Sequence, residues 1–105
     1  MGYKLITAPE YNQLLDERAG YLAETKANPQ AAVHLLDEVE LIYDRLEDDP
    51  QQFPFSEDPF LSRRGYRKAI VGDMHYVILF IVDEVGKVVY IEGFFHQLED
   101  YGTKI

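Results

Sequence analysis

The sequence predicts an α+β fold of the order β-α-α-β-β-β, in which an antiparallel sheet packs against an N-terminal helical hairpin. Three observations lead to it. The first half holds two apolar stripes at helical spacing, the second half holds three apolar runs separated by turn signals, and a short strand-like run precedes them all. With 105 residues, the chain is expected to form a single domain, residues 1–105.

The first strand and helix are predicted from the start of the chain. Residues 3–7 form a strand-like run, and Thr7-Ala8-Pro9-Glu10 predicts a capping box with Thr7 as the N-cap. The apolar positions that follow recur at the spacing of one helical face. They are Tyr11, Leu14, Leu15, Ala19 and Leu22.

A second helix is predicted to begin at Asn28-Pro29, because asparagine is a good N-cap and proline suits the first helical position. Its apolar stripe consists of Ala32, Leu35, Leu36, Val39, Ile42, Tyr43 and Leu46. Since the link between the two helices is short, they are expected to form an antiparallel hairpin.

Residues 48–62 are predicted to form a loop, since three prolines interrupt regular structure there. Its three phenylalanines, Phe53, Phe55 and Phe60, indicate that the loop packs down on the domain. A loop of this length is more often functional or ordered by contacts than idle.

Three strands are predicted over 66–71, 74–82 and 87–95, with Gly72-Asp73 as a two-residue type II′ turn between the first two. The middle strand is almost wholly apolar, which indicates burial on both faces. Glu92 and Gly93 interrupt the last run and mark either a bulge or a site. The strand at residues 3–7 is expected to pair with one edge of this meander, and either edge is possible.

Composition narrows the function classes. The absence of cysteine excludes disulfides, thiolate metal sites and cysteine nucleophiles. The longest apolar run, residues 76–82, is far shorter than the roughly 20 residues that a bilayer requires, so we expect a soluble cytoplasmic protein without membrane contact. The net charge of −9 argues against non-specific nucleic-acid binding, and most acidic side chains lie within residues 10–58.

Four segments, in this order and spacing, resemble the RelE/ParE superfamily of toxins, also called plasmid stabilisation toxins. They are residues 3–10, 28–32, 65–72 and 94–101. The resemblance implies the toxin of a type II toxin–antitoxin system, which is neutralised by a cognate antitoxin and inhibits growth when free. RelE-like members cleave mRNA on the ribosome, whereas ParE-like members poison DNA gyrase, and both share one fold.

The first hypothesis is a ribosome-dependent mRNA endonuclease that needs neither a metal nor another cofactor. One alternative is a ParE-like gyrase inhibitor without catalytic activity, and another is a non-toxic antitoxin-binding module. Acidic residues in the 48–62 loop, together with Gln97 where family members often carry arginine, weigh against the nuclease. The sequence leaves the target, the oligomeric state and the identity of the antitoxin open.

The nuclease hypothesis assigns roles to six residues. Arg67 matches the arginine of the family's strand and is expected to stabilise the phosphorane charge. His96 is the candidate general acid or base, and Tyr101 supplies a hydroxyl or stacks on a base. The role of binding the flanking phosphates is assigned to Arg63, Arg64 and Lys68.

Each of these assignments has a structural alternative. The basic cluster also fits a solvated surface patch or a landing site for an acidic antitoxin segment. His96 is equally a strand-end histidine satisfied by the backbone, and Tyr101 an aromatic that covers the sheet edge. The other two histidines, His34 and His75, are expected to be structural, and no spacing links the three as metal ligands.

Overall fold

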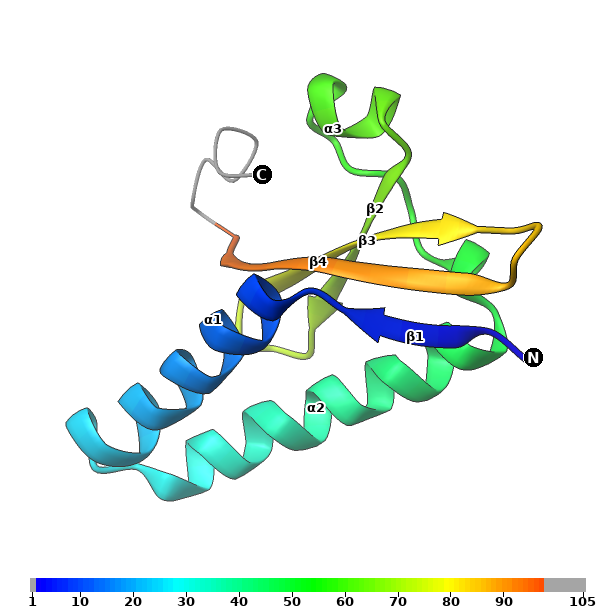
Figure 1. Ribbon diagram of the computed structural model, residues 1–105. Helices are drawn as coiled ribbons and strands as arrows, with labels where there is room; N and C mark the ends of the chain where they lie inside the picture. The colour runs from blue at the N-terminus through cyan, green and yellow to red at the C-terminus, as the bar shows by residue number, and fades with distance from the viewer. Residues whose placement is uncertain (1, 98–105) are drawn as a thin grey trace.

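The computed structural model describes residues 2–97, which form a four-stranded sheet with a pair of long helices along one face (Figure 1). This is the predicted α+β arrangement. None of the helices in the described range has the length and apolar character that would let it cross a bilayer. The elements in chain order are β1 Lys4–Thr7, α1 Pro9–Gly20, the π-helical η1 Tyr21–Thr25, α2 Pro29–Asp48, the 3-10 turn η2 Pro50–Gln52, α3 Pro59–Arg63, β2 Tyr66–Val71, β3 Tyr76–Asp83 and β4 Val88–His96.

The strand order is β1-β4-β3-β2, with antiparallel pairing between β2 and β3 and between β3 and β4. The first strand joins at β4 and runs parallel to it, so the sheet is mixed rather than wholly antiparallel. Backbone hydrogen bonds hold both ends of β1: the Lys4 amide donates to Lys87 and the Ala8 amide to Ile91. The structure thereby settles which edge the first strand takes.

Strand β3 is buried on both faces, as its continuous apolar run predicted. Tyr76, Ile78 and Phe80 pack toward the helices, whereas Val77 and Leu79 belong to a smaller cluster on the opposite face. All five side chains are at most 8% exposed. Burial of this much apolar area is the main stabilising contribution to the fold.

The two helix starts differ in how well they were predicted. Asn28 caps α2 as expected, because its side chain accepts a hydrogen bond from the Ala31 amide at 3.1 Å. The capping box at α1 is wrong: Ala8 is the N-cap and no side chain caps the helix. The Thr7 hydroxyl instead accepts a bond from the Asn12 side-chain amide, since Thr7 is the last residue of β1.

The turn between β2 and β3 is longer than predicted. Val71 pairs with Tyr76, which leaves a four-residue connection in place of a two-residue type II′ turn. Gly72 and His75 both adopt positive φ, at 49° and 64°. Glycine adopts this conformation without the steric penalty that a β-carbon introduces.

A β-bulge interrupts β4, as the Glu92-Gly93 pair had suggested. Leu79 pairs with Gly93 and Phe80 pairs with Ile91, so Glu92 has no partner of its own on β3. A bulge of one residue reverses the alternation of side chains beyond it. Phe94 therefore packs toward the helices and Phe95 toward the opposite face.

A hydrogen-bonded tyrosine pair joins the two long helices. The hydroxyls of Tyr11 and Tyr43 lie 2.5 Å apart, and Tyr11 is fully buried. Burial raises the pKa of the Tyr11 hydroxyl well above its ordinary value, and its bond to Tyr43 and the neighbouring Glu40 charge raise it further. Burial likewise raises the pKa of Tyr43.

This pair predicts a loss of stability at high pH. A raised folded-state pKa contributes stability that is complete below the unfolded value of about 10 and is lost as pH rises beyond it. In Tyr11→Phe, the free energy of unfolding at pH 8 should fall by about 1 kcal/mol through the lost hydrogen bond. Above pH 10, its further decline should be shallower than in the wild type, by up to about 1.4 kcal/mol per pH unit. Urea unfolding at pH 8 measures the first difference, and urea unfolding at several pH values above 10 measures the two slopes. Parallel declines of the free energy of unfolding in the two proteins would contradict the prediction.

Candidate functional site

The segment between α2 and α3 pairs with the outer edge of β2. The Ser56 amide donates to Tyr66 at 2.9 Å, and the Lys68 amide donates to Pro54 at 3.0 Å. Phe55 forms an isolated antiparallel bridge with Arg67. The loop therefore extends the sheet locally and covers backbone groups that an edge strand would otherwise expose.

Arg67, the predicted phosphate-stabilising residue, is turned into this loop. Its Nη1 donates to the Phe53 carbonyl at 2.7 Å and approaches the Gln51 carbonyl at 3.4 Å. The guanidinium carbon also lies 3.9 Å from the centroid of the Phe55 ring. The side chain thus holds the loop by charge-assisted hydrogen bonding and by a cation–π contact.

The other basic residues of the cluster have separate environments. Arg64 stacks on the Phe60 ring at 3.7 Å, and Lys68 forms an ion pair with Glu57. The hydrogen bond from Lys68, followed by its charge, lowers the pKa of the Glu57 carboxyl. Arg63, at the end of α3, is exposed.

The short helix α3 was not predicted, although its signal is present in the sequence. Asp58 accepts hydrogen bonds from the Phe60 and Leu61 amides, and Pro59 follows as the first helical residue. This is the same pattern as Asn28-Pro29 at the start of α2. Only one of the three loop phenylalanines packs into the core: Phe53 is 5% exposed, whereas Phe55 and Phe60 are 50% and 44% exposed.

The structure does not bring Arg67 and His96 together. Arg67 pairs with Phe80 on β3, whereas His96 pairs with Tyr76 and packs edge-on against its ring. Tyr76 and Phe80 are four positions apart on β3, which corresponds to about 13 Å along the strand, and Arg67 and His96 lie on different strands. Tyr101 lies outside the described residues.

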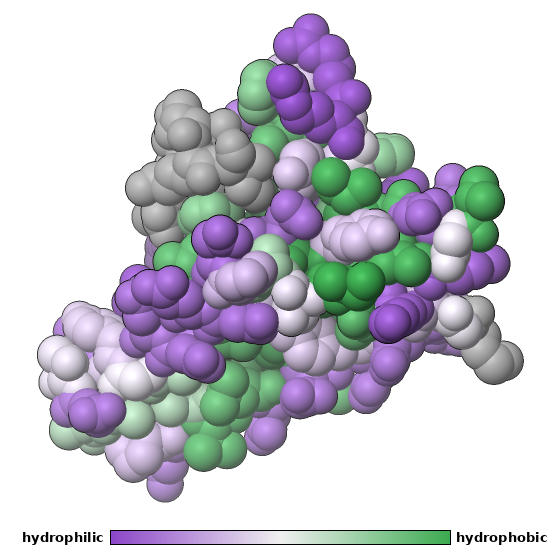
Figure 2. Space-filling model, viewed as in Figure 1, coloured by the Kyte–Doolittle hydropathy of each residue, from purple (hydrophilic) through white to green (hydrophobic). Residues whose placement is uncertain are grey.

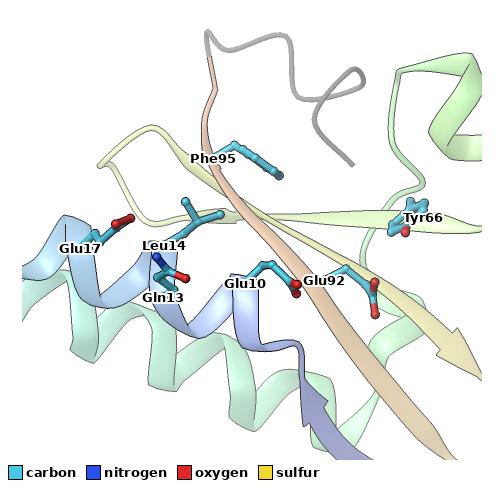
Figure 3. Close-up of a pocket in the computed structure, with 7 residues that line it drawn as sticks. All are labelled: Glu10, Gln13, Leu14, Glu17, Tyr66, Glu92 and Phe95. Carbon is cyan, nitrogen blue, oxygen red and sulfur yellow. The ribbon is translucent and has the colours of Figure 1, made fainter.

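A groove opens on the face of the sheet opposite to α2 (Figure 3), with a volume of about 600 Å³. Helix α1 forms one wall, and β4 and β2 contribute the other described residues. The lining consists of Glu10, Gln13, Leu14, Glu17, Tyr66, Glu92 and Phe95. The sequence interpretation missed this site, although positions 10, 13, 14 and 17 have the spacing of one helical face.

The groove is electrostatically negative. Its three carboxylates, Glu10, Glu17 and Glu92, form no ion pair within residues 2–97. Burial raises the pKa of the Tyr66 hydroxyl, and the Glu92 charge raises it further, whereas Arg64 lowers it. In the described part of the chain, no cluster of three or more acidic, histidine or cysteine side chains is arranged to hold a metal ion.

The contacts of Arg67 predict a structural effect of its removal. Arg67→Ala should lower the free energy of unfolding by about 1–3 kcal/mol, because it removes a charge-assisted bond to a loop carbonyl and a ring contact. The Ser56 and Lys68 amides should lose protection in hydrogen exchange, since both bonds depend on the position of the loop. Arg63→Ala serves as the matched control and should change stability by less than about 0.5 kcal/mol. Unchanged protection in Arg67→Ala would refute the anchoring role.

Comparison with known proteins agrees with this fold. The family described as the ParE toxin of the type II toxin–antitoxin system parDE matches residues 5–101. A solved structure described as the chromosomal ParDE TA system from P. aeruginosa is similar with a TM-score of 0.69, over 90% of this chain and 95% of that one, at 18% identity. No curated protein matches. The structural likeness at this identity supports the fold, and the family match covers nearly the whole sequence. The chain therefore belongs to the ParE toxin family of type II toxin–antitoxin systems, within the RelE/ParE superfamily.

Proposed function

We propose that this toxin acts by binding its target, in the manner of ParE-like gyrase inhibitors, and not by cleaving mRNA. The observation that carries the proposal is the position of Arg67, whose guanidinium bonds to the Phe53 carbonyl of the neighbouring loop. This reverses the order of the two hypotheses drawn from the sequence. A gyrase target places the action in the cytoplasm, with a cognate antitoxin as the second partner.

Metal-independent RNA cleavage requires a base, an acid and a cationic group around one phosphate, each within hydrogen-bond reach. Arg67 and His96 are separated by about 13 Å along β3, and the Arg67 guanidinium points toward Phe55. Lys68, assigned to a flanking phosphate, is paired with Glu57. This separation supports a binding toxin over a nuclease.

The charge of the chain supports the same proposal. A net charge of −9 repels the phosphate backbone of mRNA, at a cost that rises as salt is lowered. The surface around α3 suits a protein target better. It presents two exposed phenylalanines, Phe55 and Phe60, with Arg64 stacked on Phe60 and Arg63 beside it. Aromatic residues and arginine are enriched at the energetic centres of protein interfaces.

A supercoiling assay with purified gyrase tests the proposal. The wild-type toxin should inhibit supercoiling while reporter mRNA in a parallel translation reaction stays intact. Phe60→Ala combined with Arg64→Ala should weaken inhibition by about tenfold or more, as expected for loss of an aromatic and an arginine anchor. His96→Ala is the matched control and should inhibit like the wild type.

The opposite pattern would contradict the binding mechanism. Full supercoiling at saturating toxin, together with mRNA cleavage that His96→Ala or Arg67→Lys abolishes, would restore the nuclease hypothesis. Supercoiling inhibition that the Phe60 and Arg64 substitutions leave unchanged would move the contact surface elsewhere on the toxin.

A further inference from the structure

The face of the sheet opposite to the helical hairpin carries an apolar row that crosses all four strands. Ile6 pairs with Tyr90, Tyr90 with Ile81, and Ile81 with Tyr66, so the four side chains lie side by side on one face. Ile6 is 40% exposed and Tyr90 is 37% exposed. Figure 2 shows apolar residues gathered at the centre of this view, between more polar surfaces on either side.

The acidic groove adjoins this row and shares Tyr66 with it. Its apolar lining comes from Leu14, Tyr66 and Phe95, and its carboxylates come from α1 and the bulge of β4. Because positions 10 and 17 lie seven residues apart on α1, their α-carbons are about 10.5 Å apart along the helix. The surface therefore combines an apolar strip with two negative charges about two helical turns apart on α1 and a third on β4.

We propose that this groove and the adjoining row bind an amphipathic basic segment of the antitoxin, whose lysine or arginine side chains pair with Glu10, Glu17 and Glu92. The proposal rests on membership of the toxin family, which implies an antitoxin, and is independent of the gyrase target. Charge complementarity identifies the occupant. Within residues 2–97, the three carboxylates form no ion pair and none of the residues that line the groove is basic.

The carboxylates of the groove lie on two elements: Glu10 and Glu17 on α1, and Glu92 at the bulge of β4. The basic side chains of a bound segment should therefore face these two elements. Opposite charges at an interface fix the register and speed association more than they add affinity.

The contributions of the apolar surface and of the ion pairs to binding of the segment can be ranked by size. The apolar row and the groove floor supply the main driving force, because burial of apolar area dominates association. Exposed ion pairs contribute less, each changing the dissociation constant by about fivefold at most. Removal of all three carboxylates is therefore expected to weaken binding by about tenfold, an effect that high salt should reduce.

The test uses a synthetic amphipathic peptide of about 18 residues, five helical turns, with leucine on one face and lysine on its flanks. Its binding to the full-length toxin is measured by calorimetry at low and high salt. A matched peptide with glutamine in place of lysine reports the charge dependence. The toxin variant Glu10→Gln, Glu17→Gln, Glu92→Gln should bind the lysine peptide about tenfold more weakly than the wild type.

A second variant controls for net charge. Asp16→Asn, Asp37→Asn, Asp44→Asn removes the same three charges from exposed helix positions outside the groove, and it should bind like the wild type. The cognate antitoxin should displace the lysine peptide. Supercoiling inhibition is measured separately, so failure of the gyrase proposal would leave these binding results unaffected.

Four results would overturn the inference. Equal weakening in both triple variants would reduce the effect to overall charge, and equal binding of the glutamine peptide would remove the ionic component. Failure of the antitoxin to displace the peptide would exclude it as the occupant of this face. Wild-type dimers that dissociate in the Glu→Gln variant would assign the face to a second copy of the chain.

Discussion

The arrangement of the loop that carries the proposed target-binding surface depends on one interaction, the bond between the Arg67 guanidinium and the Phe53 carbonyl. It holds the segment after α2 along the edge of β2, where Phe53 packs edge-on against Phe80 in the core. With the segment in place, Phe55 covers the guanidinium and α3 begins at a defined position beyond the strand edge. Arg67 therefore contacts the loop through both its guanidinium hydrogen bond and the Phe55 ring, and in our proposal the exposed aromatic residues of that loop bind the target.

The two faces of the sheet differ in how their side chains are distributed. One face is filled by the helical hairpin and forms the larger core. The other has a small cluster around Leu61, Val77 and Leu79, and it leaves an apolar row and a negative groove at the surface. The bulge at Glu92 contributes to both faces, since it directs Phe94 into the core and Phe95 toward the groove. A bulge beside a binding surface is a common device for directing side chains.

Local patterns predicted the fold well because apolar periodicity reports directly which side of an element is buried. The stripes along α1 and α2, apart from the 41% exposed Leu36, and the apolar β3 are of this kind. The Asn28 cap was predicted from a different local signal, a capping residue followed by proline. The parallel pairing of β1 and the role of Ala8 depend on where β4 lies, more than eighty residues away, and no local pattern contains that information. The partners of Arg67 were missed for the same reason, because they are backbone carbonyls of a loop whose path follows from tertiary packing. The groove was missed because its walls, α1 and β4, meet only in the folded protein.

The state of the Arg67 guanidinium tests the central claim most directly, and NMR of the side chain with isotope-labelled arginine reports it. If the guanidinium is anchored, its Nη protons should exchange slowly and its shifts should carry the ring current of Phe55, with no change when an oligoribonucleotide is added. Rapidly averaged signals that move as the RNA is titrated would show a guanidinium available to phosphate, and would contradict the account.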